Sequence, residues 1–107
     1  MNTTGFIRGY MSKNMSAESF IIVVAKALSR EFEEEVNTIF ISQNEYLILF
    51  KEYRVSINTD LVEELKSKSP YGVDKLLLQE FRKQGFSFDE NRSQYILYCL
   101  LWFHPIL

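Results

Sequence analysis

The apolar residues of this chain change their period along its length, and each period predicts a type of element. Ser16 can cap a helix, and Glu18 in the first turn favours the positive end of the helix dipole. A stripe at helical spacing follows and consists of Ile21, Val24, Leu28 and Phe32. The pattern favours a helix from residue 16 onward, while the β-branched run at 21–24 leaves a strand as the alternative.

Residues 36–57 change to short runs of β-branched and aromatic residues. Two of these runs flank the polar pair Gln43-Asn44, which is typical of the tight turn of a hairpin. From Glu45 onward the apolar positions keep one alternating phase that Lys51 interrupts. We therefore expect a three-stranded antiparallel meander, with its second turn near Lys51-Glu52, where no glycine, proline or asparagine marks a turn.

Two helices are predicted after the strands. Asp60 can cap the first helix, and Pro70 ends it. The second helix has an apolar stripe from Val73 to Phe81, and Gly85 follows its last turn in the position that favours a left-handed residue. This second pattern is the clearest helical signal in the chain.

Residues 86–103 admit two interpretations. Ser87 and Glu90 form a capping box, which favours a helix from Phe88 to Trp102. Alternatively, the apolar runs "FSF" and "QYILYCL" on either side of the polar "DENRS" form a hairpin that adds strands to the sheet. We favour the helix.

The first fifteen residues show neither period, carry two glycines and have a net charge of +2. We therefore expect a flexible arm over residues 1–15 and a single α+β domain over residues 16–107. A chain of 107 residues has the size of one hydrophobic core. The expected order is a helix, an antiparallel three-stranded meander, and then two or three C-terminal helices.

The composition is that of a globular protein in the cytoplasm. The net charge of −2 is too small to attract nucleic acid or an anionic membrane by itself. The single cysteine, Cys99, excludes a disulfide framework, and its apolar neighbours indicate a buried side chain. The apolar run at 20–28 resembles a signal-peptide core, but it is short and closely follows Glu18. The apolar C-terminal run at 95–107 is too short to span a membrane, so we expect no membrane contact.

No residue pattern indicates catalysis, a metal or a cofactor. His104 is the only histidine, and Cys99 lies five positions from it, which places the two on different faces of a helix. Structural zinc takes four Cys or His ligands, and the chain has two such residues. The four glycines are scattered and form no phosphate-binding loop. We therefore expect a protein that is not an enzyme and binds no cofactor.

Charged and aromatic clusters supply two candidate binding surfaces. The first would meet a partner protein and consists of Glu31, Glu33, Glu34, Glu35, Trp102 and Phe103. The second would meet nucleic acid in the helices of residues 61–84 and consists of Lys75, Gln79, Arg82 and Lys83. Nearby carboxylates leave the segment 61–84 with a net charge of only +1, so the nucleic-acid interpretation is not favoured.

The last six residues, 102–107, are an apolar surplus beyond the predicted core. They either fold back onto the domain or dock on a second chain, so a homodimer is an open alternative. Truncation after Leu101 should then destabilise the domain or abolish self-association.

The stretch "TGFIRGYMSK" at 4–13 resembles the opening of small uncharacterised proteins encoded by phages and other mobile elements of Gram-positive bacteria. The predicted order of elements is also similar to that of some small anti-CRISPR inhibitors. The resemblance implies a cofactor-free protein that binds and blocks a host protein. The leading hypothesis is a non-enzymatic protein-binding module, and the resemblance suggests an inhibitor of a bacterial defence protein as its more specific form. A small nucleic-acid-binding regulator and a structural or dimerisation protein are the alternatives.

Overall fold

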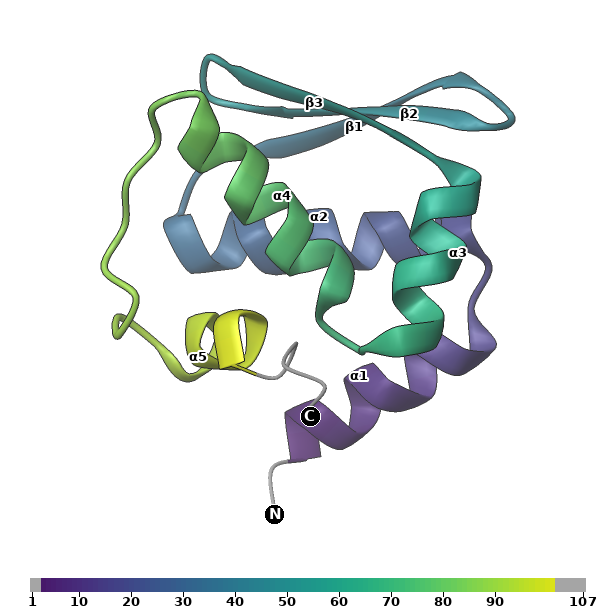
Figure 1. Cartoon of the computed structure of the whole chain (residues 1–107), viewed down its shortest axis with the longest axis horizontal. Coiled ribbons are helices and arrows are strands. Elements are labelled where there is room, and N and C mark those ends of the chain that lie inside the picture. Colours follow the sequence, from purple (N-terminus) through teal and green to yellow (C-terminus); the bar gives the residue numbers. More distant parts are fainter. Residues whose placement is uncertain (1–2, 102–107) are drawn as a thin grey trace.

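The computed structural model describes residues 3–101 and the side chains of residues 5–100. The sheet orders its strands β1-β2-β3, both pairs antiparallel, and the helices lie on one side of it (Figure 1). The α+β class and the three-stranded meander are therefore confirmed. The elements are α1 (Thr3–Asn14), α2 (Ala17–Phe32), β1 (Val36–Ser42), β2 (Glu45–Phe50), β3 (Tyr53–Asn58), α3 (Thr59–Lys68), α4 (Gly72–Lys83) and α5 (Gln94–Leu101).

Helix α2 packs against the inner face of the sheet and forms the centre of the core. The side chain of Ser16 accepts a hydrogen bond from the backbone N–H of Ser19 at 3.2 Å, which confirms the predicted cap. The alternative strand at 21–24 is therefore wrong. Burial of each large apolar side chain contributes about 2 kcal/mol. The buried residues of α2 and β2 include Phe20, Ile21, Val24, Leu28, Tyr46, Ile48 and Phe50.

Both turns of the meander lie where the sequence predicts them. Ser42 pairs with Glu45, and Phe50 pairs with Tyr53, so each turn has two residues. Lys51 makes the second turn with φ of 54°, in the left-handed region that glycine usually occupies. Because lysine rather than glycine, proline or asparagine occupies this position, the sequence carries no typical turn residue here.

Helices α3 and α4 end as predicted, while α3 begins two residues early. Asn58, rather than Asp60, caps α3 by accepting a hydrogen bond from the N–H of Leu61 at 2.8 Å. At the end of α4, Gly85 has φ of 117°, and the N–H of Phe86 donates to the helix at the carbonyl of Phe81. This is a Schellman motif, and it confirms the role predicted for the glycine.

The predicted helix from Phe88 to Trp102 is wrong over its first half. Residues 86–93 contain no helix, and α5 begins only at Gln94. The hydroxyl of Ser93, and not that of Ser87, accepts the capping hydrogen bond, from the N–H of Ile96 at 3.1 Å. Tertiary packing decides this difference, because Phe86 and Phe88 place their rings 5.1 and 5.8 Å from that of Phe32. The alternative hairpin is also wrong.

The first residues differ most from the prediction, because Thr3–Asn14 form a helix instead of an irregular arm. The buried side chains of α1 are the polar Arg8 and Ser12, whereas Phe6 and Tyr10 are exposed. This reverses the usual amphipathic pattern, so no apolar period reveals the helix.

Among the residues that the structure describes, no helix is long and apolar enough to cross a bilayer.

Candidate functional site

Helix α1 is attached to the domain through a buried arginine. The guanidinium of Arg8 forms two hydrogen bonds with the carboxylate of Asp74 on α4, at 2.6 and 2.9 Å. It also donates to the carbonyl of Pro70 at 3.0 Å and lies 4.6 Å from the ring centre of Tyr71. Arg8 is 6% exposed and Asp74 is fully buried. Such a bidentate pair fixes both the position and the rotation of α1.

A third element joins this pair, because the hydroxyl of Tyr95 on α5 donates a hydrogen bond to the Asp74 carboxylate. Burial raises the pKa of Tyr95 well above its usual value, and the charge of Asp74 adds to the shift. Burial also raises the pKa of Tyr71 to about 12. Burial alone would lower the pKa of Arg8, but the charge and hydrogen bonds of Asp74 outweigh it and raise this pKa. Asp74 therefore ties α1, α4 and α5 together as one hydrogen-bonded unit.

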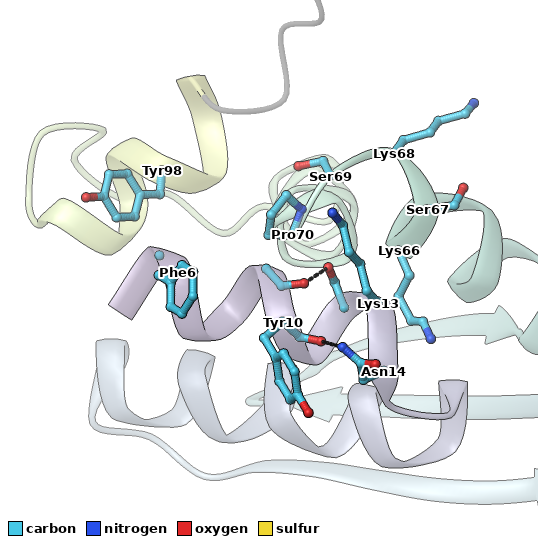
Figure 2. A pocket seen from close by; sticks show the side chains of 13 residues that line it. Phe6, Tyr10, Lys13, Asn14, Lys66, Ser67, Lys68, Ser69, Pro70 and Tyr98 are labelled. Carbon is cyan, nitrogen blue, oxygen red and sulfur yellow. Dashed lines mark hydrogen bonds between the residues drawn. The ribbon is translucent and has the colours of Figure 1, made fainter. Parts of the chain in front are cut away.

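A groove lies on the other side of α1, between this helix and the C-terminal end of α3. We call it the α1–α3 groove; its volume is about 720 Å³. Figure 2 shows Phe6, Tyr10 and Lys13 along α1, Tyr98 of α5 near one end, and residues 66–70 along the other wall. The lining residues are Gly5, Phe6, Gly9, Tyr10, Ser12, Lys13, Asn14, Lys66, Ser67, Lys68, Ser69, Pro70 and Tyr98.

Two aromatic side chains of the groove are unusually accessible. Phe6 is 68% exposed and Tyr10 is 66% exposed. They are four residues apart and therefore project from the same side of α1. The backbone that carries them cannot shift freely, because Arg8 holds the helix between them. The groove thus presents preordered aromatic surface to solvent.

The polar part of the groove is basic, and two of its serine hydroxyls donate to backbone carbonyls. Ser12 donates to the carbonyl of Gly9 at 2.8 Å, and Ser67 donates to that of Glu64 at 2.7 Å. Lys66 donates to the carbonyl of Met15 and forms an ion pair with Glu63 at 3.3 Å. The described lining residues include no carboxylate, imidazole or thiol. The charged side chains of this lining are therefore all cationic lysines.

Of the four glutamates predicted to meet a partner protein, Glu31 is largely buried, whereas Glu33, Glu34 and Glu35 are exposed. Glu31 accepts hydrogen bonds from Arg92 at 2.6 Å and from Ser93 at 2.9 Å, so it holds the start of α5. Glu33 ends α2 in the left-handed region, with φ of 52°, which turns the chain away from the helical face. Glu34 lies 3.5 Å from Lys51, and Glu35 is exposed beside β1. They do not share one helical face, and no group of metal ligands occurs among the described residues.

The basic face predicted for nucleic acid is largely neutralised by neighbouring carboxylates. Arg82 stacks 4.1 Å from the ring centre of Phe88 and pairs with Glu90 at 2.9 Å. Lys83 pairs with Glu80 at 3.0 Å. Lys75 is half-buried on α4. Gln79 is exposed but carries no charge. This face therefore offers little net positive charge to a phosphate backbone.

Trp102 and Phe103 lie outside the described residues, as does His104. Cys99 is fully buried, as its neighbours predicted, and burial raises the pKa of its thiol above the usual value. The groove residues Phe6 and Tyr10 were not among the site residues predicted from the sequence. The repeated pair Gly-aromatic in "GFIRGY" was the available signal, because a period of four marks a helical face.

Comparison with known proteins gives no match to a protein-family model, to a curated protein or to a solved structure.

Proposed function

We propose that the protein is a small non-enzymatic protein-binding module that receives an apolar segment of its partner in the α1–α3 groove. The observation that carries this proposal is the exposure of Phe6 and Tyr10 on a helix that a buried ion pair holds in place. Aromatic side chains at the centre of an interface supply much of the binding energy in protein complexes. Because α1 is already ordered, little conformational entropy is lost on binding.

The chemistry of the groove supports binding rather than catalysis. Its described lining combines aromatic rings and Pro70 with lysines, and its serines Ser12 and Ser67 are hydrogen-bonded to backbone carbonyls. A partner segment with a large apolar side chain beside a carboxylate would complement both parts. Lys13 is the exposed cation nearest to the aromatic pair along α1 and would meet such a carboxylate.

A more specific form of the proposal is an inhibitor, encoded by a mobile element, of a bacterial defence protein in the cytoplasm. Its support is the resemblance of residues 4–13, which lie within α1 and include Phe6 and Tyr10. The stretch that carries the resemblance is thus the helix that forms one wall of the groove.

The test compares three purified proteins in affinity enrichment from cells of the source organism. The wild type, the double variant Phe6→Ser/Tyr10→Ser and the control Ile22→Ser serve as baits. Ile22 is a 37% exposed apolar residue of α2 that does not line the groove. We expect a partner that the wild type and the control retain and the groove variant loses. Reconstitution of the purified pair should then show binding weakened by about 2 kcal/mol or more in the groove variant.

Melting curves should be nearly equal for all three proteins, because exposed side chains change stability by only about 0.5 kcal/mol. A partner that binds the groove variant as tightly as the wild type would contradict the proposal. Tight binding to random duplex DNA, with affinity that falls steeply as salt rises, would instead support the nucleic-acid regulator.

A further inference from the structure

Strand β1 is an edge of the sheet and carries three consecutive exposed apolar residues. Ile39 is 46% exposed, Phe40 is 41% exposed and Ile41 is 54% exposed. Natural edge strands usually carry charges or prolines that prevent pairing with another chain. Val36–Ser42 contains neither, and its one irregularity is the register shift between Phe40 and Ser42, near its end.

The opposite edge of the sheet is protected by a side chain. Gln84, at the end of α4, accepts a hydrogen bond from the N–H of Arg54 at 3.2 Å and donates one to its carbonyl at 2.8 Å. Arg54 itself adds an exposed charge to β3. No side chain among the described residues is hydrogen-bonded in this way to the backbone of β1 at 36–41. Gln84 therefore occupies the β3 edge at Arg54, whereas no described side chain occupies the β1 edge in this way.

The direction of the exposed side chains determines how a partner approaches. Phe40 is paired with the buried Tyr46 and lies on the inner face, where their rings are 5.4 Å apart. Ile39 is paired with Leu47 on the outer face. A partner that packs on one face of the sheet covers only one of these two residues. A strand beside β1 contacts both, because its own side chains also alternate between the faces.

The charge pattern around β1 fits a second copy of the same strand in antiparallel orientation. Glu33, Glu34 and Glu35 precede β1, and the neutral turn Gln43-Asn44 follows it. Antiparallel pairing places the acidic run of each copy near the neutral turn of the other. Parallel pairing would place the two acidic runs side by side, which like-charge repulsion disfavours. Twofold symmetry also lets the same apolar residues of both copies meet.

We infer that β1 pairs antiparallel with β1 of a second copy and joins the two three-stranded sheets into one. The α1–α3 groove is not part of this contact, because α1 lies at the far side of the helices from the sheet (Figure 1). Each dimer would present two grooves, and a partner with two binding segments would be held more tightly by the dimer than by the monomer.

The first test measures mass in solution by sedimentation equilibrium. A chain of 12.7 kDa should show twice that mass at high protein concentration. Ile41→Lys should weaken dimerisation by about tenfold or more, because it places a charge at the apolar edge. The matched control Leu47→Lys changes the outer face of the central strand and should remain dimeric. A monomeric wild type, or dissociation by Leu47→Lys but not by Ile41→Lys, would overturn the inference.

The second test does not depend on the stability of a variant. Single cysteines are placed at Asn37, Ile39 and Ile41, and the proteins are oxidised under mild conditions; the native Cys99 is buried and should not react. We expect a disulfide-linked dimer for at least one β1 position and none for Ser56→Cys on β3. Linkage at Ser56 alone would show that the opposite edge pairs. The β1 cysteine variants should still form the disulfide-linked dimer when they also carry Phe6→Ser/Tyr10→Ser. The dimer and the groove proposal can therefore fail independently of each other.

Discussion

Arg8 and Asp74 form a deeply buried ion pair. Its contribution to stability depends on the cost of leaving either charge buried without its partner. A buried charge without a partner is strongly unfavourable, whereas a satisfied pair contributes little net stability compared with apolar residues. Asp74 also accepts a hydrogen bond from Tyr95, so three helices depend on one carboxylate. The pair therefore specifies where α1 docks more than it increases the stability of the fold.

A double-mutant cycle tests this role. Arg8→Met leaves Asp74 buried and unpaired, so the free energy of unfolding should fall by about 3–5 kcal/mol in urea denaturation. Adding Asp74→Leu to Arg8→Met should recover about 2 kcal/mol or more of that loss, because the unpaired charge is removed. Lys13→Met, an exposed lysine on the same helix, is the control and should change stability by about 0.5 kcal/mol at most. Strict additivity of the two single changes would show that the pair is not coupled.

Two tyrosine hydroxyls and one thiol near Asp74 predict how the stability of the fold depends on pH. The pKa values of Tyr71, Tyr95 and Cys99 are raised in the folded protein, Tyr71 to about 12. These groups keep their protons in the folded state at a pH where the unfolded chain loses them. Their contribution to stability is therefore complete below about pH 9, the usual value for the thiol, and is lost as the pH rises toward 12.

Urea denaturation between pH 8 and pH 11 measures the effect. Tyr95→Phe should reduce the decline of stability in this window, because one of the titrating groups is gone. Tyr10→Phe, which changes an exposed tyrosine, should keep the slope of the wild type. Equal slopes for all three proteins would refute the assignment to Tyr95.

At the scale of elements, the turn between β2 and β3 places a lysine in a backbone conformation that favours glycine. Lys51 has φ of 54°, a conformation that costs a residue with a side chain about 1 kcal/mol relative to glycine. Its ion pair with Glu34 spans 3.5 Å between exposed side chains and offsets little of this cost. The antiparallel pairing of β2 with β3, which Phe50 and Tyr53 close at the turn, fixes the turn in spite of the unfavourable residue.

Lys51→Gly should therefore raise the free energy of unfolding by about 0.5–1 kcal/mol, measured by thermal or urea denaturation. Glu52→Gly is the matched control, since Glu52 does not have a positive φ and gains no relief from glycine. We expect the control to be neutral or destabilising, because glycine adds freedom to the unfolded chain. Stabilisation by both changes would indicate that the conformation of Lys51 is not the cause.

Over the whole molecule, the sheet and α1 lie on opposite sides of the helical layer (Figure 1). The β1 edge and the α1–α3 groove are therefore spatially separate, and the core between them is formed by α2, α4 and the inner face of the sheet. The proposed partner groove and the proposed dimer contact would therefore not overlap.

The sequence by itself determined the elements whose side chains follow a local rule. The period of Ile21, Val24 and Leu28 predicted α2, and alternation predicted the meander, because burial of one face imposes each period. Gly85 and Ser16 marked helix ends, since capping depends on residues close in sequence.

Only the tertiary structure decided where the chain departs from those rules. Helix α1 docks on the domain through Arg8, whose partner Asp74 lies 66 positions away in the sequence. The segment of Phe86 and Phe88 is not helical, because both rings pack on Phe32. No local pattern records such contacts, because they join residues distant in sequence. The groove residues Phe6 and Tyr10 follow from the same cause: once Arg8 faces inward, the aromatic side of the helix must face solvent.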